Sequence, residues 1–83
     1  MTYTVNEKAL KRQFGKIIRA GRKKKKLTQE RLSELTGITQ AYLRDIEHGN
    51  STVTWIIWLR LCTVLDLDIP KFQEEYFSPQ FDA

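Results

Sequence analysis

Four neighbouring side chains near the middle of the chain have the sizes and polar groups needed to contact the edges of base pairs. The amide of Gln40 can form two hydrogen bonds with adenine N6 and N7, and the guanidinium of Arg44 can pair in the same way with guanine O6 and N7. Ala41 and the methyl group of Thr39 can touch a thymine methyl group. These side chains are therefore chemically suited to contact duplex DNA.

Each of the polar residues in this segment also has a structural role open to it. Thr39 is suited to cap a helix N-terminus, and Gln40 beside it could simply be solvated. Arg44 could pair with Glu47, three residues further along the same helix. Tyr42 could pack on the preceding helix or donate its hydroxyl hydrogen to a phosphate, because its ring is apolar and its tip is polar. On the sequence alone both sets of roles stay open.

The remaining reactive residues do not suggest catalysis. The chain has one cysteine, Cys62, and one histidine, His48, so neither an intramolecular disulfide nor a zinc site of cysteine and histidine ligands can form within it. No glycine-rich phosphate loop and no nucleophile with a matching base is evident. We therefore expect no enzymatic activity, no metal or other cofactor and no small-molecule ligand.

Charge is distributed unevenly along the 83 residues, whose net charge is +4. Residues 1–44 contain 12 Lys and Arg against 3 acids, which gives +9, and residues 45–83 contain 2 against 7, which gives −5. The basic half predicts a polyanionic partner, and Lys25 and Lys26 are candidates for phosphate contact. A solvated, lysine-rich helix end is the alternative. No segment resembles a signal peptide or a membrane span, so we expect a cytoplasmic protein without a membrane partner.

Hydrophobic spacing predicts the helices that would position these residues. Thr28 can cap a helix that starts at Gln29 and ends at Gly37, and Thr39 can cap a second that ends at Gly49. Two short helices joined by a glycine turn, over about residues 28–47, form a helix-turn-helix. A longer helix is expected before them, over about residues 6–25. The predicted inward residues of the three helices are Leu10, Phe14, Ile17, Ile18, Leu32, Leu35, Leu43 and Ile46.

The second half of the chain predicts two more helices. Thr54 is the expected N-cap of the first, whose length and period favour a helix over a strand. Its predicted buried stripe is Trp55, Trp58, Leu59, Cys62 and Leu65. Asp68, with Pro70 just inside, predicts the start of the other, and residues 78–83 are expected to form a loose tail. The expected architecture is one all-α, five-helix domain over residues 1–83.

Apolar residues that fall outside the buried stripe predict a self-complementary patch between two copies of the chain. These candidate dimer-interface residues are Ile56, Ile57, Ile69, Phe72 and Tyr76, with Phe77 and Phe81 nearby. They lie in the acidic half, apart from the basic residues that suit DNA. We therefore expect a homodimer with separate surfaces for DNA and for the partner subunit.

The segment from Leu27 to Gly49 resembles the Cro/C1-type (Xre) family of helix-turn-helix regulators, in its Leu-Thr-Gln, Gly-Ile, Tyr-Leu and Ile-Glu-x-Gly motifs. The resemblance runs from about residue 14 to 72. It implies a five-helix, lambda-repressor-like fold that regulates transcription, usually as a dimer on a near-palindromic operator, with the third helix in the major groove. Matched by position, the implied DNA-contacting residues are Gln29, Thr39, Gln40, Ala41, Arg44 or Asp45, His48 and Asn50.

The sequence departs from the family pattern at a few positions. Ser33 replaces the usual alanine at the contact between the two short helices, and Val53 stands where a proline usually precedes the fourth helix. Asp45 places an acid on the recognition helix, which favours an alternative function as a protein-interaction module. The lysine run alone would fit a nonspecific nucleic-acid binder. The lead-in from Lys11 to Lys16 is similar to that of restriction–modification controller proteins, and a phage or mobile-element repressor and an antitoxin-type autoregulator are the alternatives within the family.

Overall fold

The computed structural model describes residues 7–68 and residue 71, and over these residues it contains helices but no strand. The predicted all-α class is confirmed. The helices are α1 (Glu7–Lys24), α2 (Gln29–Thr36), α3 (Gln40–Glu47) and α4 (Trp55–Leu65). The expected fifth helix and the tail at 78–83 lie outside the described residues. At the expected helix start, Asp68 Oδ1 accepts a hydrogen bond from the backbone N–H of Lys71 at 3.0 Å.

Threonine side chains begin three of the helices, as predicted. The hydroxyl oxygens of Thr28, Thr39 and Thr54 each accept a hydrogen bond from the backbone N–H three residues later, at 3.0, 3.0 and 3.3 Å. These bonds satisfy donors that have no partner inside the helix. Gly37 ends α2 with φ of 75°, and its N–H donates to Ser33 O at 2.9 Å. This left-handed residue produces the tight turn into α3.

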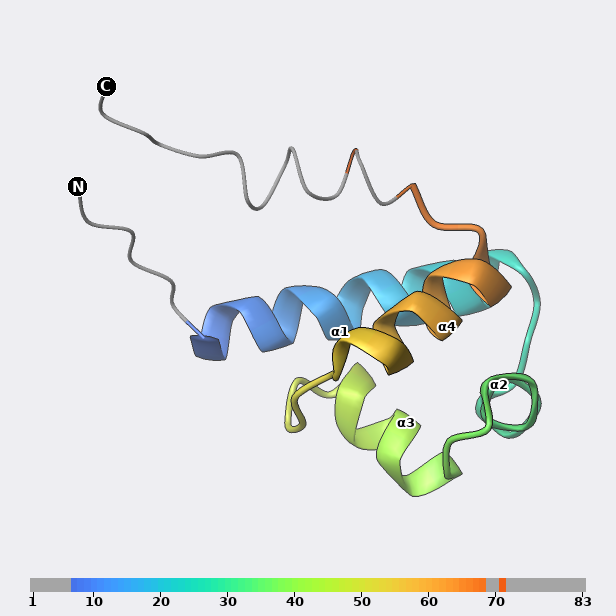
Figure 1. Ribbon diagram of the computed structural model, residues 1–83, viewed down its shortest axis with the longest axis horizontal. Coiled ribbons are helices and arrows are strands. Elements are labelled where there is room, and N and C mark those ends of the chain that lie inside the picture. The colour runs from blue at the N-terminus through green and yellow to red at the C-terminus, as the bar shows by residue number, and fades with distance from the viewer. Residues whose placement is uncertain (1–6, 69–70, 72–83) are drawn as a thin grey trace.

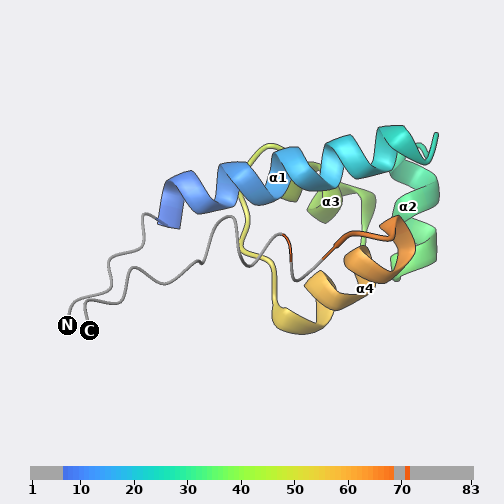
Figure 2. The same ribbon diagram turned by 90° about the horizontal axis from the view of Figure 1, so that it is seen from above.

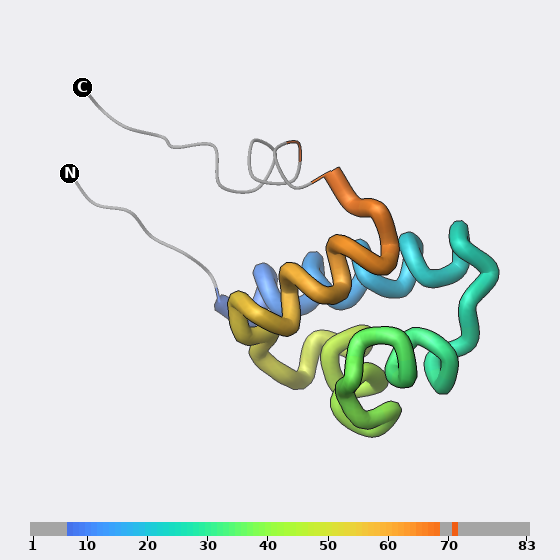
Figure 3. The backbone as a smooth tube through the Cα atoms, turned by 45° about the vertical axis from the view of Figure 1, so that its right-hand side comes forward, coloured from blue at the N-terminus to red at the C-terminus, as the bar shows by residue number. Residues whose placement is uncertain are grey.

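The helices are arranged so that α1 and α4 cover the helix-turn-helix unit. Figure 1 shows α4 crossing α1, with α3 below them and α2 at the far end of α1. Figure 2 places α1 and α4 on opposite sides of the fold when it is seen from above, and Figure 3 shows α2 and α3 together beneath both. Contacts between α1 and α3, α2 and α3, α2 and α4, and α1 and α4 tie the four helices into one core.

All four helices contribute to the core. Its buried apolar residues are Ile18, Leu32, Leu43, Ile46, Trp58, Leu61, Cys62 and Leu65. Phe14 packs on Trp58 with 5.1 Å between the ring centroids and so joins α1 to α4. Five of the predicted inward residues of α1 and α3 therefore lie at or against the core, namely Phe14, Ile17, Ile18, Leu43 and Ile46, whereas Leu10 is half-buried outside it. Burial raises the pKa of the Cys62 thiol to about 11, which suits a core residue and not a nucleophile.

Three residues predicted to face inward are in fact exposed. Trp55 is 67% exposed, Leu35 is 44% exposed and Leu59 also faces solvent, so these predictions are wrong. Segment 55–65 is apolar at so many positions that it fits more than one helical stripe, and the observed stripe is 58, 61, 62 and 65. In α2 the buried places besides Leu32 go to Ser33 and Thr36, whose hydroxyls donate to Glu30 O and Leu32 O. These bonds satisfy the hydroxyl groups, so both residues can be buried.

Candidate nucleic-acid interface

One side of α3 presents the residues that were predicted to contact bases. Gln40, Ala41, Arg44 and Asp45 are all exposed, as is the capping residue Thr39. Helical spacing places Ala41 and Asp45 opposite the buried residues of α3, with Arg44 beside them, while Gln40 is exposed at the start of the helix, two turns before Glu47. The structure therefore brings the predicted base-contacting residues together on one free surface.

Arg44 does not form the helical pair with Glu47 that the sequence allowed. Glu47 points away from it and is 2% exposed, whereas Arg44 is exposed and has no ion-pair partner among residues 7–68 and 71. Asp45 likewise has no ion pair within that part of the chain. The guanidinium of Arg44 is therefore available to an external partner, and so is the carboxylate of Asp45.

The side chain of Tyr42 links α3 to the loop that follows it. Its hydroxyl donates to Thr52 O at 2.7 Å, while its half-buried ring packs against the core. His48, exposed at the end of α3, has Nδ1 2.8 Å from Arg44 O, and the backbone N–H of Asn50 donates to Asp45 O at 2.8 Å. These bonds hold the turn after α3 beside the exposed face, with the side chains of His48 and Asn50 exposed.

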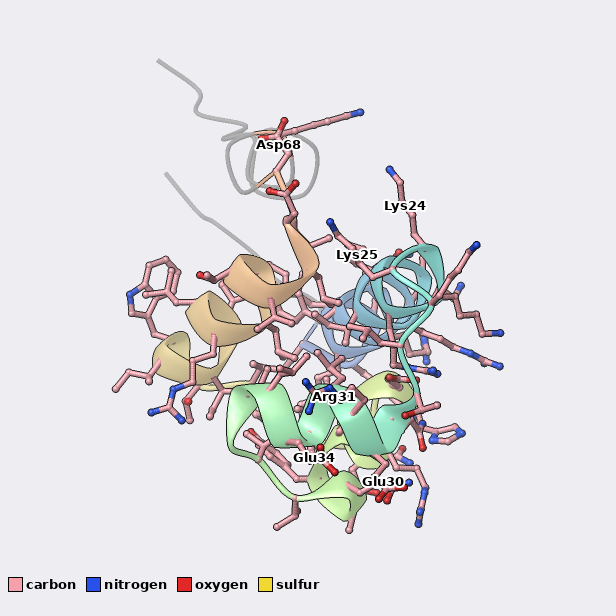
Figure 4. All side chains as sticks on the ribbon, turned by 90° about the vertical axis from the view of Figure 1, so that its right-hand side faces the viewer. Lys24, Lys25, Glu30, Arg31, Glu34 and Asp68 are labelled. Atoms are coloured by element: carbon pink, nitrogen blue, oxygen red, sulfur yellow. The ribbon has the colours of Figure 1, made fainter. Side chains whose placement is uncertain are left out.

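The predicted phosphate-contacting residues before α3 lie in two different places. Gln29 begins α2 and is half-buried, and its Nε2 donates to Glu47 Oε1 at 3.2 Å. Lys25 and Lys26 are exposed in the turn between α1 and α2, where Lys26 has φ of 58°. Figure 4 shows Lys24 and Lys25 extending on the side of Asp68, away from α2. Gln29 thus lies nearer to the exposed face of α3 than Lys25 does.

A buried ion pair that the sequence analysis missed fixes the helix-turn-helix to α1. Arg22 donates from Nε to Glu47 Oε2 at 2.8 Å and from Nη2 to Glu47 Oε1 at 3.0 Å. Its Nη1 also donates to Leu27 O at 3.0 Å. Hydrogen bonding to Glu47 raises the pKa of Arg22, and the partial burial of Arg22 opposes that shift. With Gln29 as its second partner, Glu47 links the ends of α1 and α3 to the start of α2.

A glycine in α1 allows α3 to approach closely. A Cβ atom built at Gly15 would collide with Ile46 O and would lie 2.7 Å from Glu47 O, both on the backbone of α3. No side chain fits at this contact, because backbone atoms cannot rotate away. The C-terminal end of α3 is therefore set directly against α1, while its N-terminal end remains exposed.

The predicted dimer-interface residues are only partly described. Ile56 is 62% exposed on α4, whereas Ile57 is half-buried against the core. Ile69, Phe72 and Tyr76 lie outside the described residues. Trp55 and Leu59, predicted to be buried, instead join Ile56 on the exposed side of α4. The structure thus has an exposed apolar patch on α4, formed by Trp55, Ile56 and Leu59.

The geometry of α2, its glycine turn and α3 is that of a helix-turn-helix unit, and comparison with known proteins agrees. A helix-turn-helix family model matches residues 18–72, and the chain belongs to the Cro/C1-type (Xre) family of DNA-binding transcription regulators. A similar solved structure is the restriction–modification controller protein C.AhdI from Aeromonas hydrophila. It is 35% identical, with a TM-score of 0.68, over 72% of this chain and 91% of that chain. The comparison with curated proteins gives no match.

Two further properties of the described residues bear on function. No helix among them is long and apolar enough to cross a membrane. Nor do they include a group of three or more His, Cys, Asp or Glu placed to hold a metal ion.

Proposed function

We propose that this protein regulates transcription as a homodimer that binds a near-palindromic operator, with α3 of each subunit in the major groove. The observation that carries the proposal is the asymmetry of α3. Its inner side is held by Gly15 and by the Arg22–Glu47 pair, while Gln40 and Arg44 are exposed and Arg44 has no ion pair in the described part of the chain. A rigid helix with free polar side chains is what sequence reading requires.

The contacts divide into those that read bases and those that position the protein. In the proposed complex Gln40 and Arg44 pair with base edges, with Thr39, Ala41 and Asp45 beside them. Phosphates are met by Gln29, His48, Asn50 and the basic residue Lys26, and the hydroxyl of Tyr42 holds the adjoining loop, whereas Lys25 extends with Lys24 on the side of Asp68. Free N–H groups at the start of α2 and α3 add favourable partial charge.

The similarity to C.AhdI supports a more specific proposal: that this protein controls genes of a restriction–modification system. Occupying the operator would then either exclude RNA polymerase or recruit it. The proposed activity is binding without catalysis, in the cytoplasm, and it needs no cofactor.

Replacing the base-reading residues should reduce sequence specificity without unfolding the domain. We expect Gln40→Ala and Arg44→Ala each to weaken binding to the preferred operator by about 1–3 kcal/mol, because each removes a bidentate pair. Binding to random duplex should change much less. Competition assays on both duplexes measure the difference. Lys24→Ala, which removes an exposed charge on the side of Asp68, is the control. Equal losses on both duplexes would mean that neither residue reads sequence.

Dimerisation should depend on the exposed apolar patch of α4. We expect sedimentation at micromolar concentration to show a dimer, and Ile56→Asp to weaken it at least about tenfold, since an interface that buries an unpaired carboxylate is strongly disfavoured. Ala20→Asp, an exposed substitution on α1, is the matched control. Either of two results would show that this patch is not the dimer interface. One is a wild-type protein that stays monomeric at high micromolar concentration, and the other is an Ile56→Asp variant that dimerises normally.

A further inference from the structure

The outer side of α1 has an uninterrupted row of basic side chains. At 100° per residue, positions 8, 12, 16, 19 and 23 fall within a sector of about 80° on the helix surface. All five are exposed, and we name them the α1 basic stripe: Lys8, Arg12, Lys16, Arg19 and Lys23. The acid of α1, Glu7, lies on another side of the helix, where it pairs with Lys11 at 3.6 Å. The stripe is therefore a surface of one sign of charge.

The stripe is not neutralised by the rest of the described chain. Its members form none of the ion pairs between described residues, which join Lys11 to Glu7, Arg22 to Glu47 and Arg31 to Glu34. Neighbouring like charges on the helix repel one another, and an external polyanion would relieve that repulsion. An external anionic partner of extended shape fits a stripe of about 22 Å, the length of 15 residues of helix.

The stripe adjoins the candidate DNA interface. Gly49, in the turn after α3, lies so close to α1 that an added Cβ would be 3.0 Å from Arg12 Cγ and 3.1 Å from its Cα. His48 and Asn50, the proposed phosphate-contacting residues, flank that glycine. At Gly15 the backbone of α1 touches the end of α3. A DNA phosphodiester backbone that passes His48 and Asn50 would therefore reach the α1 basic stripe next.

The part of the stripe nearest the start of α1 precedes the family match. The family model begins at residue 18, whereas Lys8, Arg12 and Lys16 lie before it. α1 begins at Glu7, so it extends nearly three turns beyond the matched segment. The extended helix and its charges are thus features of this chain that the family match does not account for.

We propose that the α1 basic stripe is a second DNA contact, which binds the phosphodiester backbone beside the phosphates reached by the turn after α3. The inference rests on the proposed DNA-binding function. It extends the proposed DNA interface from the turn after α3 onto the outer side of α1. Contact of this kind is independent of sequence, so the stripe increases affinity and fixes the placement of α1 on the duplex, while α3 reads the bases.

The test is the salt dependence of DNA binding by a variant without the outer charges, Lys8→Gln/Arg12→Gln/Lys16→Gln. Each lost phosphate contact should lower the slope of log K against log[salt] by about 0.9, or about 2.7 for all three. Between about 50 and 200 mM salt the wild type should then lose about 40-fold more affinity than the variant. Phosphate ethylation interference should detect contacts that the variant lacks.

A matched control removes the same number and types of charge from other surfaces. Lys24→Gln/Arg60→Gln/Lys71→Gln changes one arginine and two lysines that are exposed outside the stripe, and we expect it to leave the slope within about 0.5 of wild type. Equal slope changes in both variants, or an unchanged slope and ethylation pattern in the stripe variant, would overturn the proposal. Circular dichroism and thermal melting confirm that both are folded.

The measurement is made on the preferred operator and on a random-sequence duplex. A real stripe contact lowers the slope on both, since phosphates are the same on each. If no preferred operator exists, the proposed regulatory function fails, yet the random duplex still tests the stripe. If the operator is bound specifically but the variant has wild-type slopes on both duplexes, only the stripe contact fails.

Discussion

Replacing Arg22 with methionine should lower the free energy of unfolding by about 3–5 kcal/mol, because it leaves the carboxylate of Glu47 buried without its main partner. The side chain of Glu47 is 2% exposed and that of Arg22 is 12% exposed, so water cannot replace the lost bonds without opening the structure. Gln29 supplies one hydrogen bond, which does not compensate a buried charge. Urea denaturation at neutral pH measures the change.

The control for this prediction removes both charges. Arg22→Met/Glu47→Met replaces the pair with apolar side chains of similar length, and it should recover most of the stability lost by Arg22→Met alone. The double variant should nevertheless bind DNA more weakly, since the bonds that orient Gln29 and the end of α3 are gone. If Arg22→Met is as stable as wild type, the ion pair does not hold α1 to the helix-turn-helix.

Adding a single methyl group at Gly15 should cost about 2–3 kcal/mol of folding free energy, although alanine is normally the better helix residue. The new Cβ would collide with Ile46 O and approach Glu47 O to 2.7 Å, and these backbone oxygens can yield only if α3 moves. Since α3 is the proposed recognition helix, Gly15→Ala should also weaken specific DNA binding in the molecules that remain folded. Thermal melting and operator binding are measured on the same preparation.

A second buried glycine of α1 provides the matched control. A Cβ at Gly21 would lie 3.2 Å from Leu67 Cδ2 and 3.4 Å from Leu65 Cδ1, which are the ends of flexible side chains. Gly21→Ala should therefore be neutral, or more stable by up to about 1 kcal/mol, because alanine restricts the unfolded chain and favours the helix. If the two variants lose similar stability, backbone contact at Gly15 is not what sets the position of α3.

The helix-turn-helix was predictable because its signals are local. Thr28 and Thr39 cap helices through bonds to residues three positions away, and Gly37 adopts the left-handed conformation that a tight turn requires. The exposed face of α3 follows from the same boundaries. Each of these features depends on a few consecutive residues, so the sequence contains all the information that they need.

The features that were missed depend on contacts between distant segments. Arg22 and Glu47 are 25 residues apart, and helical spacing offered Arg44 as a nearer partner for Glu47. One signal was present, since Glu47 follows Ile46 and Leu43 on the buried side of α3, where a charge requires a partner. The close approach at Gly15 has no comparable local signal, because it depends on where α3 lies.

The orientation of α4 was mistaken for a different reason. Its segment is apolar at nearly every position, so spacing predicted the helix but not which side faces the core. Leu61 is fully buried although it was not predicted to be, and Trp55 is exposed although it was. The packing of α1 and α2 against α4 decides between the possible stripes, and that packing is a tertiary property.

Selection of bound duplexes from a randomised pool, followed by affinity measurement at two salt concentrations, tests whether this protein recognises a specific DNA sequence. We expect an enriched inverted repeat with half-sites about one helical turn apart. The enriched duplex should be bound at least about 1,000-fold more tightly than random DNA at physiological salt, and this preference should fall in Gln40→Ala and Arg44→Ala. No enriched sequence, with affinity that declines equally on every duplex as salt rises, would contradict this expectation and favour a scaffold that does not read DNA.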